Sequence, residues 1–444
     1  MMSADSIQKE QLLTRIAAKS AVVGVIGLGY VGLPLALVFE EAGFRVIGFD
    51  VDRSKSEALR KGESYIRHIG PRRVADAFER GRIQITSEFV RLSSCDAILI
   101  CVPTPLGRHR DPDISYIRRT ADAIAERLRP GQLVVLESTT YPGTTREELV
   151  PRFAAKGFTC GDDVFVAFSP EREDPGNPIF HTRNIPKVVG GICAASLEVA
   201  VALYSAAIEN VVRVSTAEVA ESAKLLENIF RAVNIVLVNE LKVVFDKMQI
   251  NIWDVIEAAK TKPFGFMPFY PGPGLGGHCI PLDPFYLSWK ASEYGVWSRF
   301  IELAGEINSG MPRYVVDKTV RALNDEGKSI RGAKVLVLGL SYKPDIDDDR
   351  ESPSFEIIDR LQELGAAVSY CDPHIPKTKK VRKYDLGLKS TPCSEEEFAR
   401  HDVLIVATAH NGFRTPGLFR LARLVVDTRN LLSPDALDGP LIRA

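Results

Sequence analysis

The sequence lacks a long apolar segment, a metal-binding cysteine spacing and an excess of charge of either sign. No apolar run reaches the roughly 18 residues that a bilayer-spanning helix needs, so we expect no contact with a membrane. The 56 basic residues balance 57 acidic ones, and the net charge of -1 does not favour nucleic acid as a partner. The 7 cysteines never lie at CxxC spacing, which argues against a disulfide framework and a zinc site and favours a reducing cytoplasm.

At 444 residues the chain is too long for one hydrophobic core, and two or three domains are expected. From Ala21 onward, short β-branched runs alternate with amphipathic stretches such as 115–128, a pattern typical of a parallel sheet covered by helices. The predicted strands of this region are Val22–Ile26, Arg45–Phe49, 97–102, 133–137 and 164–167. The segment 1–19 carries apolar residues at helical spacing, and it is predicted to pack as a helix on this domain.

The stretch 216–247 contains neither glycine nor proline, and its apolar positions recur at three and four. It predicts a helix of roughly 45 to 50 Å, longer than one domain needs. A second alternating region follows, with predicted strands 335–338, 367–370, 403–407 and 424–426. We therefore predict an α/β protein in which two Rossmann-like doubly wound domains are joined by a long central helix.

The expected domains are residues 1–212, 213–325 and 326–444. The long helix is too apolar to be covered on every face by its own domains. We therefore expect a homodimer, or a higher homo-oligomer, packed through this helix.

A glycine-rich turn follows the first predicted strand and opens onto a helix start. Its sequence is Gly27-Leu28-Gly29-Tyr30-Val31-Gly32, the pattern of a dinucleotide-binding fingerprint. Asp50 ends the next strand, where a carboxylate accepts from adenosine ribose hydroxyls and repels a 2′-phosphate, so NAD is the predicted cofactor. Arg53 is either a solvated side chain or a contact to the adenine end.

A single thiol stands on a turn built from glycine and proline. The run Gly276-Gly277-His278-Cys279-Ile280-Pro281 would hold Cys279 in place for covalent chemistry. The alternative is that Cys279 is a small buried hydrophobic residue. His278 either shapes the turn and contacts substrate or acts as a base that lowers the thiol pKa.

Together these motifs resemble the UDP-glucose/GDP-mannose dehydrogenase family over nearly the whole chain. The resemblance is also carried by Val102-Pro103-Thr104-Pro105, Glu137-Ser138-Thr139, Ser169-Pro170-Glu171-Arg172, Lys224 with Glu227-Asn228, Tyr342-Lys343-Pro344, Asp349-Arg350-Glu351-Ser352 and Asp427-Thr428-Arg429-Asn430. It implies two successive hydride transfers from the C6 alcohol of a nucleotide sugar to two NAD, ending in a carboxylate. Cys279 would capture the intermediate aldehyde as a thiohemiacetal, which is oxidised to a thioester and hydrolysed.

The resemblance also implies roles for further residues. Lys224 and Asn228, four residues apart on the long helix, would stabilise the alkoxide and orient the reacting hydroxyl or a water; a solvated helix face is the alternative. Asp283 would help activate the thiol or water, and Glu171 would assist thioester hydrolysis, although either residue can instead cap a turn. Thr139 would hold a water or the nicotinamide, unless it simply ends a strand.

The remaining implied contacts are divided between cofactor and substrate. Thr104 and Arg350 would contact NAD, and Lys343 would lie near the base or ribose of the substrate, with a charged solvated loop as its alternative. The other implied substrate contacts are Arg172, Tyr270, Gly274, Gly277 and His278.

The choice of sugar depends on the cysteine turn. His278, Leu282 and the arginine-free approach segment depart from the UDP-glucose branch and resemble the bacterial subgroup acting on UDP-N-acetylhexosamines. We therefore expect UDP-N-acetylglucosamine first, UDP-N-acetylmannosamine second, and UDP-glucose or GDP-mannose third, in the synthesis of surface polysaccharide or lipopolysaccharide precursors. A two-electron β-hydroxyacid dehydrogenase and a non-catalytic nucleotide-binding protein are the alternatives of other classes.

Overall fold

A computed structural model describes residues 4–66, 69–107, 111–173, 177, 179–277, 280–381 and 383–444. The chain forms two compact units. One comprises Met1–Glu227 with Phe285–Val296, and the other comprises Asn228–Pro284 with Trp297–Ala444. In the part of the chain so described, every helix is too short or too polar to span a lipid bilayer.

The first unit is built on an eight-stranded sheet in the order β3-β2-β1-β4-β5-β6-β7-β8. Neighbouring strands are parallel except for β7, which runs antiparallel to β6. The strands are β1 (Val22–Ile26), β2 (Arg45–Phe49), β3 (Ile83–Thr86), β4 (Ala97–Ile100), β5 (Leu133–Leu136), β6 (Phe165–Phe168), β7 (Lys187–Gly191) and β8 (Val211–Arg213). The five strands that the sequence predicted here are present, and β3, β7 and β8 are additional.

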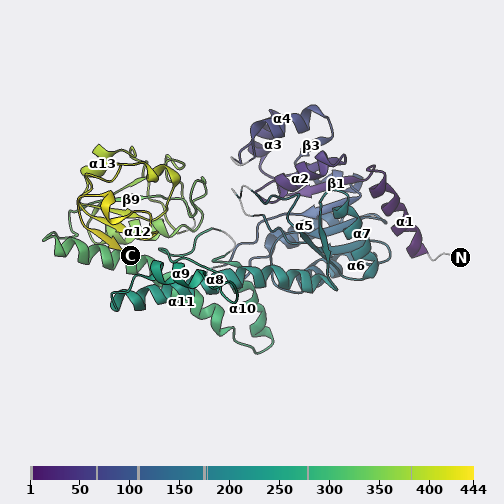
Figure 1. Ribbon diagram of the computed structural model, residues 1–444. Helices are drawn as coiled ribbons and strands as arrows, with labels where there is room; N and C mark the ends of the chain where they lie inside the picture. Colours follow the sequence, from purple (N-terminus) through teal and green to yellow (C-terminus); the bar gives the residue numbers. More distant parts are fainter. Residues whose placement is uncertain are drawn as a thin grey trace. The chain divides into compact units, whose positions relative to one another are not determined.

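Helices cover this sheet (Figure 1). They are α1 (Ala4–Ala17), α2 (Gly32–Glu41), α3 (Arg53–Arg60), α4 (Pro71–Glu79), α5 (Ser115–Ala125), α6 (Val150–Ala154) and α7 (Ala194–Ser205), with short turns η1 (Phe89–Ser94) and η2 (Thr145–Leu149). Leu12 and Ile16 of α1 join α2, α7 and the strands in one apolar core, so the predicted packing of the N-terminal helix is confirmed.

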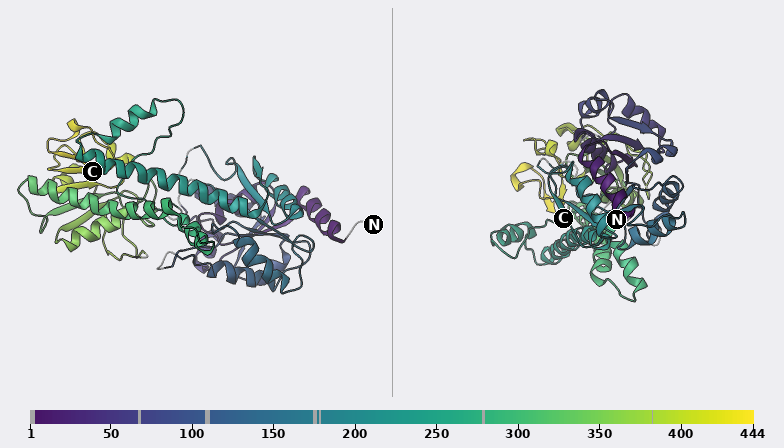
Figure 2. Two further views of the ribbon diagram at one scale, coloured as in Figure 1. Left: turned by 90° about the horizontal axis from the view of Figure 1, so that it is seen from below. Right: turned by 90° about the vertical axis from the view of Figure 1, so that its right-hand side faces the viewer.

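The predicted long helix is α8 (Ala217–Lys247), which Figure 2 shows as one continuous element. Its carboxyl half lies beside α11 (Arg299–Asp325), where Lys318 Nζ lies 2.6 Å from Asp246 Oδ1. The helices α9 (Ile252–Lys260) and α10 (Asp283–Glu293) lie between them in the chain.

The second unit contains a parallel five-stranded sheet in the order β10-β9-β11-β12-β13. The strands of this sheet are β9 (Lys334–Leu338), β10 (Ala367–Cys371), β11 (Val403–Val406), β12 (Val425–Asp427) and β13 (Leu441–Arg443). The helices between them in the chain are α12 (Pro353–Glu363) and α13 (Glu395–Ala399), with η3 (Asn411–Arg414) and η4 (Pro434–Ala436). The predicted strands are present, and β13 is additional. The fold is therefore the predicted pair of Rossmann-like domains with a long helix between them.

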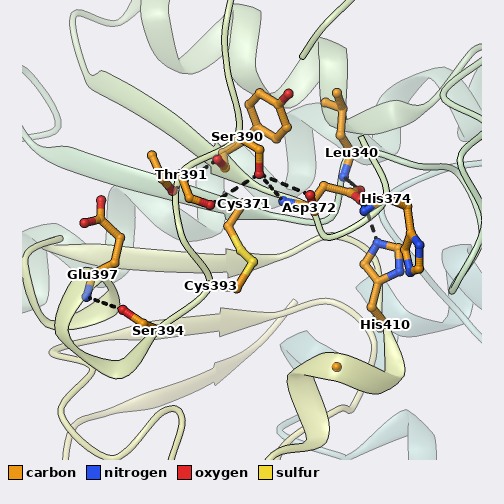
Figure 3. The surroundings of a disulfide bond; sticks show 12 residues. Leu340, Cys371, Asp372, His374, Ser390, Thr391, Cys393, Ser394, Glu397 and His410 are labelled. Atoms are coloured by element: carbon orange, nitrogen blue, oxygen red, sulfur yellow. Dashed lines mark hydrogen bonds and ion pairs between the residues drawn. A yellow bond between two sulfur atoms is a disulfide. The ribbon is translucent and has the colours of Figure 1, made fainter. Parts of the chain in front are cut away.

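One expectation about the cysteines is wrong. Cys371 at the end of β10 and Cys393 before α13 form a disulfide, with a Cα–Cα distance of 5.8 Å (Figure 3). The two residues are 22 positions apart, and the chain between them returns to its starting point, because Tyr370 pairs with Ser390 in a β-bridge. The spacing rules applied to the sequence consider only closely spaced cysteines and therefore missed this pair.

Candidate active site

The glycine turn between β1 and α2 is shaped by backbone contacts. Gly27 has φ +89°, and a Cβ there would lie 2.5 Å from the carbonyl oxygen of Cys101. A Cβ on Gly32 would lie 1.9 Å from the carbonyl oxygen of Gly27, so both positions require glycine. At Gly29, in contrast, a Cβ would have nothing within 4 Å. This open space lies where the fingerprint brings a pyrophosphate against the backbone, so the turn fits a dinucleotide.

Asp50 is buried at the end of β2 and fixes the same turn. Its Oδ2 accepts the Leu28 N–H at 2.9 Å, and its Oδ1 accepts the Asp52 N–H at 2.9 Å. Lys55 Nζ lies 3.3 Å from Asp50 Oδ2. The carboxylate thus stands beside the turn, as expected of the ribose-binding residue, while Arg53 is exposed at the first position of α3.

Two threonines of the predicted cofactor site follow strand ends of the first sheet. Thr104 is buried beyond β4, and its carbonyl oxygen accepts the hydroxyl of Tyr286. Thr139 is half-buried beyond β5. Both therefore lie at the carboxyl edge of the sheet, where ligands of open α/β sheets bind.

Glu171 belongs to a buried ionic network of the first unit. Lys187 Nζ, at the start of β7, lies 2.6 Å from Glu137 Oε2 and 3.4 Å from Glu171 Oε2. Burial opposes the charge on Glu171, but the Lys187 ammonium and the backbone N–H groups of Arg172 and Glu173 more than offset it, and the pKa of Glu171 is lowered. Glu171 is thereby kept as a carboxylate, the form that accepts a proton from water.

The first three turns of α8 contribute to this region. Lys224 is buried, and its charge also lowers the pKa of Glu171, so the two side chains lie within electrostatic range. Arg172 Nη2 lies 2.5 Å from Glu227 Oε1, and Arg172 Nη1 donates to the carbonyl of Pro186 at 2.8 Å. Arg172 therefore anchors the Glu171 segment to α8.

Asn228 and Asp283, which are far apart in the sequence, meet in the second unit. Asn228 Nδ2 donates to Asp283 Oδ2 at 2.6 Å, and both residues are buried. Asn228 is therefore not part of a solvated helix face. Asp283 is the first residue of α10, so its expected alternative as a capping residue stays open.

The predicted thiol turn is only partly described, because His278 and Cys279 lie outside the described residues. The segment leading to them is held by Asn239, which accepts the Gly272 N–H at 2.9 Å, and by Asn308, which accepts the Leu275 N–H at 2.6 Å. Gly274 has φ +131° and Gly277 has φ +82°.

The end of this segment packs on the Tyr342-Lys343 loop of the same unit. A Cβ on Gly276 would lie 2.5 Å from Tyr342 Cβ, and a Cβ on Gly277 would lie 3.0 Å from the Tyr342 ring. The Gly277 N–H donates to the Arg350 carbonyl at 2.8 Å. The glycines before Cys279 therefore allow a close approach to the loop that the resemblance assigns to substrate.

Three further residues of the predicted site make contacts within the second unit. The Tyr270 hydroxyl donates to Glu257 Oε1 at 2.7 Å, and its ring stacks on Trp253. The guanidinium of Arg350 donates three hydrogen bonds to Asp348, the shortest at 2.6 Å. Lys343 is half-buried, and its carbonyl accepts the Ser341 hydroxyl at 2.9 Å.

The carboxylate of Asp372 accepts hydrogen bonds from the backbone that leads into the Tyr342-Lys343 loop. Its Oδ2 accepts the N–H groups of Leu340 and Ser341 at 2.6 and 3.0 Å, and it lies 3.1 Å from His410 Nε2 (Figure 3). The contact with His410 and the backbone N–H groups of Ser341 and His374 lower the pKa of Asp372 to about 2 despite its burial. This arrangement repeats that of Asp50 and Leu28 in the first sheet.

Arg429 was not singled out by sequence reasoning, although its motif carried the resemblance. Its guanidinium stands so close to Gly272 that a Cβ there would lie 2.3 Å from Arg429 Nη1. Arg429 Nε also donates to the Ala407 carbonyl at 2.9 Å, and burial lowers the pKa of the guanidinium to about 10. The sequence signal that could have indicated this residue is an arginine that follows the aspartate at the end of a strand.

The fold and these residues define an NAD-dependent dehydrogenase with a second, Rossmann-like nucleotide-binding domain. The chain belongs to the UDP-glucose/GDP-mannose dehydrogenase family. The family's NAD binding domain matches residues 21–208, its central domain residues 218–310, and its UDP binding domain residues 336–434. The protein is thus an NAD-dependent nucleotide-sugar dehydrogenase.

Individual relatives match almost the whole chain. Protein CapL of Staphylococcus aureus is 35% identical over 94% of this chain and 97% of its own length. The UDP-N-acetyl-D-glucosamine 6-dehydrogenase of Pseudomonas aeruginosa is 34% identical over 95% of this chain and 99% of its own length. A solved UDP-N-acetylmannosamine dehydrogenase from Pyrococcus horikoshii superposes with a TM-score of 0.85 at 30% identity, covering 95% of this chain and 99% of the other.

Proposed function

We propose that this enzyme oxidises C6 of UDP-N-acetylglucosamine to a carboxylate with two NAD, through Cys279. The turn Gly277-His278-Cys279 and the arginine-free segment before it support an N-acetylhexosamine, and the relative from Pseudomonas aeruginosa carries that substrate in its name. The observation that carries the proposed chemistry is the carboxylate of Glu171, whose side chain is 12% exposed and which is held ionised within electrostatic range of Lys224.

The proposed reaction has two oxidation steps and one hydrolysis. NAD, held by the glycine turn and Asp50, would supply the hydride acceptor for each oxidation. Lys224 and Asn228 stabilise the alkoxide and orient the reacting hydroxyl in the first step. The Cys279 thiolate then adds to the aldehyde carbonyl and gives a thiohemiacetal. Its new hydroxyl, once deprotonated, drives loss of the second hydride from the C–H bond that the aldehyde already carried.

Hydrolysis of the resulting thioester completes the reaction. Glu171 accepts a proton from water as the water attacks the thioester carbonyl, and the Cys279 thiolate leaves. Asp283, fixed by its hydrogen bond from Asn228, assists in activating the thiol or the water. In total, the alcohol, two NAD⁺ and water give a carboxylate, two NADH and three protons.

The remaining contacts in the proposal follow the family resemblance. Leu28, Tyr30, Val31, Asp50, Arg53, Thr104, Thr139 and Arg350 contact NAD together with the three fingerprint glycines, and Arg172, Tyr270, Gly274, Gly277, His278 and Lys343 contact the nucleotide sugar. The three domains are 1–212, 213–325 and 326–444. The enzyme works in the cytoplasm and supplies uronic acid sugars for surface polysaccharide.

UDP-N-acetylmannosamine is the second candidate substrate, because the solved relative from Pyrococcus horikoshii is named for it. The decisive experiment supplies UDP-N-acetylglucosamine, UDP-N-acetylmannosamine, UDP-glucose and GDP-mannose separately and counts NADH per sugar consumed. Two NADH with the first sugar, at the highest kcat/KM of the four, is the expected result. One NADH per sugar contradicts the four-electron reaction, and preference for another sugar contradicts the substrate assignment.

Substitution of the proposed nucleophile tests the covalent route. We expect Cys279→Ala to lose acid formation while its dissociation constant for NAD stays unchanged. Cys279→Ser is expected to retain an ester adduct, because an alkoxide is a poorer leaving group than a thiolate. Normal acid output by Cys279→Ala removes this residue from the mechanism.

A further inference from the structure

The buried lysine of the first unit has no part in the chemistry proposed so far. Lys187 is 3% exposed, and its ammonium contacts Glu137 Oε2 at 2.6 Å, Glu171 Oε2 at 3.4 Å and the Pro170 carbonyl at 3.2 Å. These three partners are all acceptors, and two of them are carboxylates that follow different strands, β5 and β6.

We propose that Lys187 is a positioning residue for thioester hydrolysis, which holds Glu171 as an oriented carboxylate ready to accept a proton from water. This inference rests on the proposed role of Glu171. Lys187 acts through Glu171 and is assigned no contact with substrate or cofactor.

Glu137 serves in this arrangement as the counter-ion that fixes the ammonium. Its Oε2 binds Lys187, while its Oε1 accepts the Tyr204 hydroxyl from α7. The ammonium is therefore held rigidly from one side, and its remaining proton donors face Pro170 and Glu171. Three elements, β5, β7 and α7, thus determine where the Glu171 carboxylate stands.

The other charged groups near Glu171 either favour its ionised form less strongly than Lys187 does or oppose that form. Among them, Lys224 acts in the same direction as Lys187, but it is the smaller influence. Glu137 and Glu173 are both acidic, and the pKa of each is raised, first by burial. The Cys101 thiol also lies near Lys187 and Glu137, and burial raises its pKa well above the usual value. Lys187 is therefore the principal charge that offsets the desolvation of Glu171.

The choice of variant follows from the burial of the network. Removing Lys187 alone leaves Glu137 as an unpaired buried charge, which destabilises a fold for reasons unrelated to catalysis. The double variant K187M/E137Q removes both charges and keeps side chains of similar length. E137Q alone keeps the ammonium, which then has Glu171 as its remaining carboxylate partner among the described residues.

The experiment follows decay of the Cys279 acyl adduct in the full-length enzyme. Single turnovers with UDP-N-acetylglucosamine and NAD are quenched with acid at intervals, and the adduct is quantified by intact-protein mass spectrometry from pH 5 to 9. In the wild type, hydrolysis is expected to be independent of pH down to about pH 5, because Glu171 stays ionised. Loss of an opposite charge at this distance raises a carboxyl pKa by about 1 to 3 units.

In K187M/E137Q we therefore expect an acid limb to appear at higher pH than in the wild type. The shift should be smaller than the about 1 to 3 units for loss of the ammonium alone, because the repulsion from Glu137 is lost as well. K187R retains the charge, and E137Q retains the ammonium, so neither variant should show this upward shift. A merely structural role would lower the melting temperature without moving the limb.

Three results decide between the possibilities. An unchanged pH profile in K187M/E137Q overturns the inference, as does an upward shift in E137Q or K187R, which remain informative if the double variant does not fold. The control E171Q tests the underlying role separately. If E171Q hydrolyses the adduct at the wild-type rate, the proposed function of Glu171 itself fails.

Discussion

At the scale of single residues, the glycines of the dinucleotide fingerprint serve two different purposes: two are required for folding, and one is required for binding the cofactor. Gly27 and Gly32 face backbone oxygens at distances that exclude a side chain, so they are required for folding. Gly29 faces open space and lacks the positive φ of Gly27, so the folded chain alone would accept a side chain there. Only the approach of a pyrophosphate explains a glycine at that position.

This difference gives a matched pair of variants. Gly29→Ala is expected to keep the wild-type melting temperature and to weaken NAD binding by about tenfold or more, because its methyl group occupies the space of the pyrophosphate. Gly32→Ala is expected to destabilise the domain, because its Cβ overlaps the Gly27 carbonyl. Thermal melts and calorimetric titration with NAD measure both effects. Unchanged NAD affinity in Gly29→Ala would exclude this turn as the pyrophosphate site.

Residues that belong to a sequence motif can be identified from the sequence, whereas residues whose role depends on tertiary contacts cannot. The fingerprint and Asp50 are neighbours in a strand-turn-helix pattern that can be recognised locally. Lys187 is an isolated lysine in the sequence, and nothing local indicates that it is buried between two carboxylates. The meeting of Asn228 with Asp283 was likewise beyond the sequence, because the order of elements does not fix a side-chain contact.

At the scale of elements, the long helix α8 carries a buried lysine that the helical pattern of its sequence did not indicate. Lys242 is 4% exposed on this helix, and burial lowers its pKa to about 8. The charges of Asp246 and Asp427 favour the ammonium, while Lys318 and Arg443 oppose it. The folded protein therefore binds the Lys242 proton less tightly than the unfolded chain does.

Lys242→Met is expected to raise the stability of the protein at pH 7. Below about pH 8 the folded state retains a buried ammonium at full cost, and this cost disappears as the pH rises from 8 toward the unfolded value of 10.5. The gain in melting temperature should therefore shrink across that interval. The control is Lys247→Met at the exposed end of the same helix. A gain that is independent of pH would contradict the assigned cause.

The short strands show why some elements were missed. The strand β8 has three residues and is mostly exposed, so it carries no apolar run. The strand β7 is buried but begins with Lys187 and ends in two glycines, residues that normally argue against a strand. Both strands are specified by pairing with neighbours already in the sheet.

The disulfide links the end of strand β10 to the segment that precedes helix α13. Cys371 and Cys393 enclose a segment that leaves β10 through Asp372 and returns before α13. Closing a loop of this length restricts the unfolded chain and contributes about 3 kcal/mol in the chain-entropy estimate. Cys393 is exposed, so a reductant can reach the bond.

Reduction is therefore expected to lower the unfolding free energy of the second unit by about 3 kcal/mol. Denaturant titration with and without dithiothreitol measures the change. The double variant C371S/C393S should resemble the reduced protein and respond no further to the reductant. Equal stability of oxidised and reduced wild type would contradict a stabilising bond.

At the scale of the whole molecule, each of the two sheets has a buried aspartate that makes the same backbone hydrogen bond at the equivalent strand end. Asp50 at the end of β2 accepts the Leu28 N–H, and Asp372 at the end of β10 accepts the Leu340 N–H. In each sheet a buried carboxylate thus fixes the loop after the first strand of its domain. The second loop lacks the glycine fingerprint, so the sequence indicated its Rossmann-like strands but not this likeness.

The long helix presents apolar side chains outward along its length. Val219, Leu226, Phe230, Leu237 and Val244 are 43%, 67%, 47%, 48% and 45% exposed, respectively. Their spacings of seven and four residues place them on one side of α8, the pattern of a helix that packs against another helix. We propose that this stripe is the contact between two copies of the chain.

The stripe predicts that the wild type is a dimer and that the variant L226E/L237E is a monomer. Two glutamates in each chain would bring like charges into an apolar contact, which is costly when they are not paired. Sedimentation equilibrium at micromolar concentration measures the mass, and the matched control is Leu421→Glu, which alters a leucine that is 54% exposed outside α8. The control should remain dimeric. A monomeric wild type, or a dimer that survives both glutamates, would show that α8 does not form the contact.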